Sequence, residues 1–190
     1  MVALLLGASM DFVKIDLSIL RFIAEGLKCP ALDVTVPVFT TLGDVGICWI
    51  VLSIVLMVFK PTRKAGFVAL LSIGIGALIT NVALKNLVAR PRPYTYTEWE
   101  LLIERQSDWS FPSGHSTAAF AFATGLTLIK KKAWWVYIPA GLMALSRLYL
   151  FVHFPSDVLA GCAIGVLAGF ASRFITDTVI KKHSGKRANG

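Results

Sequence analysis

Three ionisable side chains of different kinds lie close together in the stretch SRLYLFVHFPSD, residues 146–157. Arg147 supplies a cation, His153 an imidazole and Asp157 a carboxylate, all at the edge of an apolar run. Charged groups at the margin of a membrane-like segment are costly, and they indicate a functional site. A solvated loop between two helices explains this stretch equally well when it is considered alone. The other polar clusters of the chain decide between the two interpretations.

Two further clusters have a composition suited to binding phosphate. The stretch KNLVARPRP places Lys85 and Arg92 seven residues apart at the end of an apolar run. Lysine binds phosphate as a point charge and arginine as a bidentate fork. The stretch FPSGH opens another apolar run with Ser113 and Gly114, and the free backbone N–H groups of a helix start bind anions.

The same residues contain the parts of a phosphoryl-transfer site. A histidine held by a carboxylate, as His153 would be by Asp157, has the orientation that a nucleophile or base requires. A second histidine, His115, is suited to protonate a leaving oxygen as general acid. Fixed cations would meet the charge that develops on the phosphoryl oxygens, so neither a metal nor another cofactor is expected. The clusters hold too few carboxylates for magnesium and no third ligand for zinc.

Each of these residues also has an ordinary structural explanation. Lys85 suits the end of a membrane helix, Ser113 a helix N-cap and Asp157 the first turn of a helix. Loop or helix-end positions explain the remaining charged residues, Arg90, Arg92 and His115. One shared site accounts for all of them at once, and the clusters therefore favour a function.

The composition indicates a membrane protein. Of the 190 residues 56% are hydrophobic and 16% charged, with a mean hydropathy of +0.70. The net charge of +8 comes from short basic clusters beside apolar runs, so it reports membrane topology, and no nucleic-acid partner is expected. The three cysteines, Cys29, Cys48 and Cys162, are widely spaced and predict neither a disulfide nor a zinc site.

Long apolar runs between charged connections predict an all-α bundle of five transmembrane helices, with a sixth span near the N-terminus left open. The predicted spans are residues 45–59, 65–84, 110–129, 133–146 with an extension to 152, and 158–172 with an extension to 180. We expect a single domain over residues 1–190, in which residues 45–180 form the bundle.

Residues 1–43 have a different pattern. From Ile15 to Leu27 apolar residues recur at helical spacing among charged ones, which predicts an amphipathic helix lying on the membrane surface. A helix packed against the bundle is an equally good interpretation. The apolar positions expected on one side of this helix are Ile15, Ile19, Leu20, Ile23 and Leu27.

The distribution of lysine and arginine predicts the orientation in a cell membrane. The connections at 60–64 and 130–132 and the C-terminal tail are basic and alternate correctly to share the cytoplasmic side. The connections at 86–110 and 147–157 then share the outer face. All three polar clusters fall on that outer face.

The clusters at residues 85–93, 112–115 and 146–157 resemble the three-part signature of the type-2 phosphatidic acid phosphatase superfamily. That signature reads K-x6-R-P, P-S-G-H and S-R-x5-H-x3-D, and every position of it is present here. The resemblance covers residues 85–157, and no motif covers residues 1–44.

The resemblance implies a role for each matching residue. His153 would take the phosphoryl group as a phosphohistidine, Asp157 would orient His153, and His115 would protonate the leaving group. The phosphate oxygens would be bound by Lys85, Arg92, Ser113, Gly114 and Arg147. Arg90 lies two residues from the signature arginine and is left without a role.

The resemblance also implies a metal-independent phosphatase acting on a lipid phosphate within the bilayer. An outward site favours undecaprenyl pyrophosphate, although carrier-specific relatives resemble P-S-D-H where Gly114 stands here. Phosphatidylglycerol phosphate and phosphatidic acid are the alternative substrates. A non-catalytic lipid transporter or binding protein is the alternative of another class, and vanadium haloperoxidases share the anion site but are soluble. The oligomeric state is left open.

Overall fold

The fold was obtained as a computed structural model, which describes residues 2–188 and the side chains of residues 11–182. All regular structure in these residues is helical, and they contain no strand. The predicted all-α class is confirmed.

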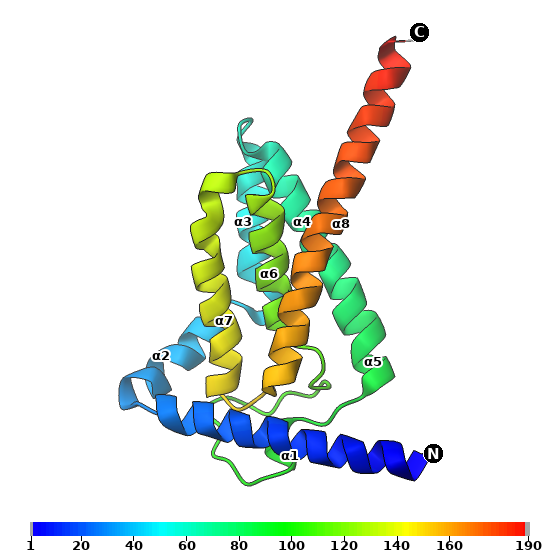
Figure 1. Ribbon diagram of the computed structural model, residues 1–190. Helices are drawn as coiled ribbons and strands as arrows, with labels where there is room; N and C mark the ends of the chain where they lie inside the picture. The colour runs from blue at the N-terminus through cyan, green and yellow to red at the C-terminus, as the bar shows by residue number, and fades with distance from the viewer. Residues whose placement is uncertain (1, 189–190) are drawn as a thin grey trace.

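Five helices run side by side and form the bundle (Figure 1). Each predicted apolar run overlaps one of them. Helix α4 continues through a π-helical segment, Leu78–Leu84, into the short helix α5, Lys85–Val88. The five are α3 (Ile47–Val58), α4 (Arg63–Ala77), α6 (Gly114–Thr127), α7 (Tyr137–Tyr149) and α8 (Pro155–Ala188).

Only some of these helices are long enough to cross a membrane alone. Residues 63–95 and 155–182 are long and apolar enough, and a third candidate is the pair of helices at 30–41 and 44–58, bent by 44°. Helix α6 has 14 residues and α7 has 13, so each rises only about 20 Å against a hydrocarbon core of about 30 Å. A multi-pass membrane protein is supported with two or three spans, and the five or six predicted crossings stay a prediction.

Close packing of α8 on α6 depends on glycine. A Cβ atom at Gly161 would meet Ser113 O at 2.6 Å, and one at Gly165 would meet Thr117 O at 2.6 Å. Only hydrogen fits at such distances, and small residues of this spacing let membrane helices approach closely. The contact joins the starts of the two helices, where the backbone N–H of Ser113 donates to Asp157 O at 3.0 Å.

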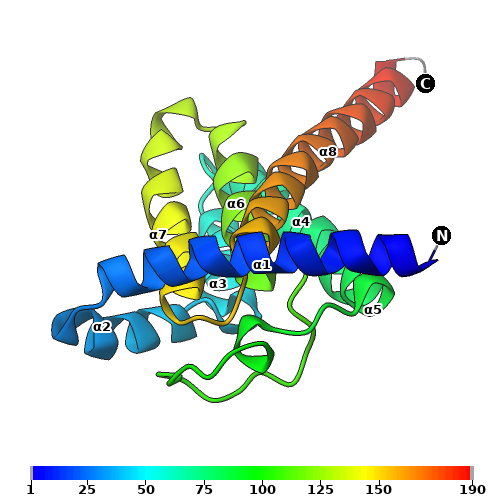
Figure 2. The ribbon, with the colours of Figure 1, turned by 60° about the horizontal axis from the view of Figure 1, so that its bottom comes forward.

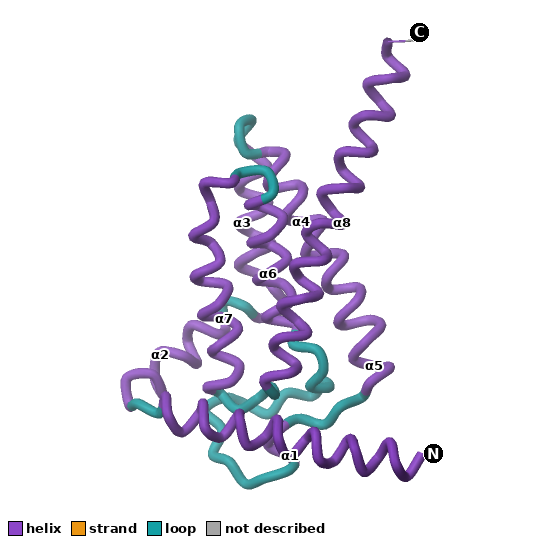
Figure 3. Tube along the Cα trace, in the orientation of Figure 1, coloured by secondary structure: helices purple, strands orange, loops and turns teal. Residues whose placement is uncertain are grey.

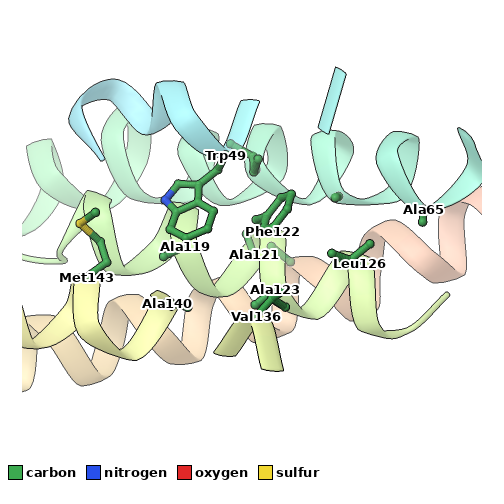
Figure 4. Packing of buried hydrophobic residues seen from close by; sticks show 13 residues of the cluster. Trp49, Ala65, Ala119, Ala121, Phe122, Ala123, Leu126, Val136, Ala140 and Met143 are labelled. Carbon is green, nitrogen blue, oxygen red and sulfur yellow. The ribbon is translucent and has the colours of Figure 1, made fainter. Parts of the chain in front are cut away.

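The main core lies between α3, α4, α6, α7 and α8 (Figure 4). The Trp49 and Phe122 rings pack with their centroids 5.2 Å apart. Small residues from α6, among them Ala119, Ala121 and Ala123, are fully buried beside them. Rigid packing in this region fixes the helix ends on which the polar clusters lie.

The N-terminal helix α1 (Val2–Leu27) lies across one end of the bundle, followed by α2 (Pro30–Thr41) (Figures 1 and 2). It contacts α7 and α8, so the interpretation as a helix packed against the bundle holds. Its position on the membrane surface stays a prediction. The residues buried against the bundle are Val13, Asp16, Leu20 and Ala24.

The expected grouping of apolar residues on α1 is wrong in part. Leu20 is buried, whereas Ile15 and Ile19 are 59% and 46% exposed. Apolar residues facing lipid cost no free energy, so apolar spacing does not reveal which face of a helix packs on protein.

The connections gather at two ends of the bundle (Figure 3). Residues 59–62 and 128–136 lie at the end from which α8 projects. Residues 89–113 and 150–154 lie at the other end, beside α1. All three polar clusters are therefore at the α1 end of the molecule.

Candidate active site

The three clusters surround one cavity of about 600 Å³ at the α1 end of the bundle, called the site cavity below. It is lined by six of the eight predicted site residues: Lys85, Arg92, Gly114, His115, Arg147 and His153. The other two, Ser113 and Asp157, are fully buried and do not line the cavity. The structure therefore brings all three clusters to one place.

His153 lies in the tight connection between α7 and α8 and is 2% exposed. This connection contains Phe151 in a left-handed conformation, with φ at 58°. Arg92 Nη1 donates to Val152 O at 2.8 Å and lies 3.4 Å from His153 Nε2. The Nε2 atom therefore faces the cations of the site cavity.

Asp157 lies on the opposite side of the His153 ring. Its Oδ2 atom is 3.7 Å from His153 Nδ1, which is longer than a hydrogen bond, and Nδ1 has no other partner among the side chains that the structure describes. The carboxylate instead accepts hydrogen bonds from Arg90 Nη1 at 2.7 Å, Ser110 Oγ at 2.5 Å and Phe154 N at 2.9 Å. The predicted pair is adjacent, but its direct hydrogen bond stays a prediction.

Lys85 and Arg92 hold a carboxylate from the connection between α5 and α6. Both side chains bind the Asp108 carboxylate, and Arg92 Nε also donates to Asp108 O at 2.9 Å. Burial acts to raise the pKa of Asp108, but the two cations hold it at about 2. The Asp108 carboxylate therefore binds two cations that are predicted to bind phosphate.

Arg147 lines the site cavity and has one buried hydrogen-bond donor that is not used within the described part of the chain. The side chain is almost fully buried, and its Nη1 donates to Thr40 Oγ1. Its Nε has no hydrogen-bond partner among the described residues. A buried donor without a partner costs free energy.

Ser113 and Gly114 differ in their access to the site cavity. Ser113 is fully buried and caps α6, accepting hydrogen bonds from Ser116 N at 3.4 Å and Ser116 Oγ at 3.0 Å. Gly114 lines the cavity. Direct binding of phosphate by either residue stays a prediction.

The part of the sequence that contains the three clusters is shared with a known family. The profile of the PAP2 superfamily matches residues 65–180, which contain all three clusters. The chain belongs to the PAP2 superfamily.

Two solved PAP2-like structures are similar over most of the chain. The crystal structure of LpxE from Aquifex aeolicus gives a TM-score of 0.70 at 32% identity, covering 82% of this chain and 93% of that one. The PAP2-type phosphatidylglycerolphosphate phosphatase from Bacillus subtilis also gives 0.70, at 28% identity, covering 93% and 92%.

Similarity in sequence extends to a curated relative. The undecaprenyl-diphosphatase of Sulfolobus acidocaldarius is 35% identical over 133 residues, which make up 68% of this chain. The match spans 64% of that relative's length.

Several residues at this PAP2 site were missed from the sequence. His115 Nε2 lies 3.0 Å from Asp44 Oδ1, and Asp44 stands in the turn between α2 and α3. The sequence marked Asp44 only as the boundary of an apolar run. Its place directly beside a long uncharged segment was the available signal, since a charge there is costly unless it has a function. The other missed residues are Asp16, Asp108 and Ser110.

The described side chains include no group of three or more His, Cys, Asp or Glu residues placed to hold one metal ion. The predicted independence from metals is untested by this observation.

Proposed function

We propose that this PAP2 protein is an integral-membrane lipid phosphatase acting through a phosphohistidine on His153. The observation that carries the proposal is the meeting of His153, His115 and three buried cations around one cavity. The names of the relatives, an undecaprenyl-diphosphatase and a phosphatidylglycerolphosphate phosphatase, support the same reaction class.

The reaction starts with the neutral imidazole of His153. Burial lowers the pKa of His153 to about 4, and the charges of Arg92 and Arg147 act in the same direction against the neighbouring Asp157. The Nε2 lone pair attacks phosphorus, an N–P bond forms and the P–O bond to the leaving group breaks. His115 gives its proton to the leaving oxygen. In the second step His115 takes a proton from water as the water oxygen bonds to phosphorus, the N–P bond breaks, and phosphate and neutral His153 are released.

The cations of the site cavity take the place that a metal has in many phosphoryl-transfer enzymes. Lys85, Arg92 and Arg147 bind the three non-bridging oxygens, and the Gly114 amide adds a neutral donor. The substrate must first displace the Asp108 carboxylate from Lys85 and Arg92. A phosphate dianion carries more charge than a carboxylate, so the exchange is favourable.

The leading substrate is undecaprenyl pyrophosphate, which an outward-facing site would convert to undecaprenyl phosphate. Phosphatidylglycerol phosphate and phosphatidic acid follow, because Gly114 stands where carrier-specific relatives resemble P-S-D-H. These lipids share a terminal phosphate on a membrane anchor and differ in the leaving group.

Phosphate release from a panel of lipids tests the function. We expect the purified protein in detergent to release phosphate from undecaprenyl pyrophosphate fastest, and from phosphatidylglycerol phosphate and phosphatidic acid more slowly. The rate should be unchanged by EDTA, since the fixed cations supply the charge. Release of phosphate from none of the lipids would contradict the enzyme and favour a non-catalytic lipid-binding protein. Loss in EDTA that magnesium restores would contradict the metal-free mechanism.

The second proposal concerns orientation: the site faces the outer side of the cell membrane and the C-terminus the cytoplasm. Its support is the basic content of the opposite end. In a variant without its three cysteines, Glu98→Cys and Lys132→Cys place one exposed thiol at either end of the bundle. We expect an impermeant thiol reagent to label only the Glu98→Cys protein in intact cells. Labelling of only the Lys132→Cys protein would invert the orientation.

A further inference from the structure

Arg90, which the three-part signature leaves without a role, lies between two buried carboxylates. Its Nη1 donates to Asp157 Oδ1 at 2.7 Å, and its Nη2 donates to Asp16 Oδ2 at 2.8 Å. The guanidinium also lies over the Phe154 ring, 3.8 Å from its centroid. The side chains of Asp16 and Asp157 are 5% and 0% exposed. Removal of one partner would leave a buried charge without an opposite charge beside it, which is strongly destabilising.

Asp16 connects this ion triad to the N-terminal helix. It occupies the stripe of α1 that packs on α7 and α8, between Val13 and Leu20. It also accepts hydrogen bonds from Ser156 N, at 3.1 Å, and from Ser156 Oγ. Ser156 precedes Asp157 in the first turn of α8, so α1 is fastened to the turn that carries Asp157.

Arg90 does not contact the place where phosphate would bind. It is absent from the wall of the site cavity, and both of its terminal nitrogens are engaged by the two carboxylates. Its effect must therefore pass through Asp157. The 3.7 Å between Asp157 Oδ2 and His153 Nδ1 is short enough that a small movement makes or loses a hydrogen bond. The position of the Asp157 carboxylate therefore decides whether His153 Nδ1 gains a hydrogen bond.

We propose that Asp16 and Arg90 are positioning residues for phosphoryl transfer, through which docking of α1 sets the alignment of the nucleophile. Asp16 holds Arg90 against Asp157 Oδ1. The Oδ2 atom, which accepts hydrogen bonds from Ser110 Oγ and Phe154 N, then lies 3.7 Å from His153 Nδ1. This inference rests on the proposed function, because His153 is a nucleophile only if the chain is a phosphatase. It gives the N-terminal segment, which no signature motif covers, a part in turnover.

The two residues differ in what their loss does to the triad. Arg90→Gln leaves two buried carboxylates without a cation, and two such groups favour protonation of one of them. A protonated Asp157 no longer stabilises the imidazole. Asp16→Asn keeps the shape of the side chain but removes one of the two charges that hold Arg90. We expect the larger loss from Arg90→Gln.

Steady-state kinetics in detergent micelles test the proposal. We expect kcat to fall about 10-fold in Asp16→Asn and about 100-fold in Arg90→Gln, the range seen when a partner of a reacting group is removed. The KM and the inhibition constant of inorganic phosphate should stay within about twofold, since the cavity cations are untouched. Asp16→Glu, which keeps the charge, should recover part of kcat. The matched control is Asp11→Asn, on the same helix with its carboxylate 76% exposed, and its kcat should equal that of the wild type.

Three outcomes overturn the inference while leaving the phosphatase intact. An active wild type with full kcat in Asp16→Asn would show that α1 has no part in alignment. A weaker inhibition by phosphate in Arg90→Gln, parallel to the loss in kcat, would make Arg90 a phosphate ligand instead. A fall in kcat explained by a lower Tm in detergent, without recovery in Asp16→Glu, would reduce the triad to a structural contact. A wild type inactive on every lipid would contradict the proposed function itself.

Discussion

Replacement of His153 by glutamine is expected to lower phosphate release at least about a thousandfold, because it removes the nucleophile of the proposed covalent intermediate. The Nε2 atom of His153 faces the cations of the site cavity, and Arg92 Nη1 lies 3.4 Å from it. Glutamine keeps a polar side chain of similar length but has no lone pair able to attack phosphorus. Binding of substrate should persist, so the loss should appear in kcat.

The control for His153→Gln is His183→Gln, near the C-terminal end of α8, which should leave the rate unchanged. The wild-type rate should also depend on pH in a defined direction. The nucleophile must be neutral, and burial lowers the pKa of His153 in the free protein to about 4, so kcat/KM should fall as the pH drops through about 4. Full activity of His153→Gln would contradict the mechanism outright.

Arg147→Lys is expected to lower kcat/KM about a hundredfold, the usual cost of one donor to the transition state. Arg147 is buried, and its Nε atom has no partner in the described part of the chain. Lysine keeps the charge but offers neither that nitrogen nor a planar fork. The contact of Arg147 with Thr40 Oγ1 fixes the guanidinium in advance, and the shorter reach of an ammonium loses this alignment.

The measurement for Arg147→Lys is kcat/KM on the best lipid of the panel, together with inhibition by inorganic phosphate. We expect a lower kcat/KM and a weaker inhibition by phosphate. In the Asp16 and Arg90 variants, by contrast, inhibition by phosphate should stay nearly unchanged. Arg63→Lys, an exposed arginine at the other end of the bundle, is the matched control and should have no effect. Unchanged inhibition by phosphate in Arg147→Lys would remove Arg147 from the phosphate site.

The residues whose proximity to one another could be predicted from the sequence are those whose neighbours are set by local structure. The apolar runs became helices because their composition leaves no other way to satisfy the backbone in lipid. Lys85 and Arg92 are seven positions apart, one in α5 and the other just past its end, so their proximity follows from the end of this helix. The spacing of His153 and Asp157 likewise places them beside each other in a single connection and the first turn of α8.

The residues that the sequence missed act through partners far along the chain. Asp16 meets Arg90 across 74 positions, and Asp44 meets His115 across 71. No periodicity encodes such a pairing, because it depends on how α1 and the turn before α3 dock. The docking face of α1 was hidden for a related reason, since its apolar residues suit lipid and protein equally. From the sequence, Asp108 is interpreted as an ordinary loop charge. Only the fold shows that it lies between two cations.

The position of Asp108 has a consequence for the end of the catalytic cycle. Inorganic phosphate left among three buried cations would dissociate slowly, and product release would then limit turnover. A carboxylate on a half-exposed connection, already able to bind Lys85 and Arg92, replaces the departing anion. Lys85 and Arg92 then keep an anionic partner in a low-dielectric site, so the free energy needed for phosphate to leave is lower. In the proposed cycle, Asp108 would act as an intramolecular competitor of inorganic phosphate for Lys85 and Arg92.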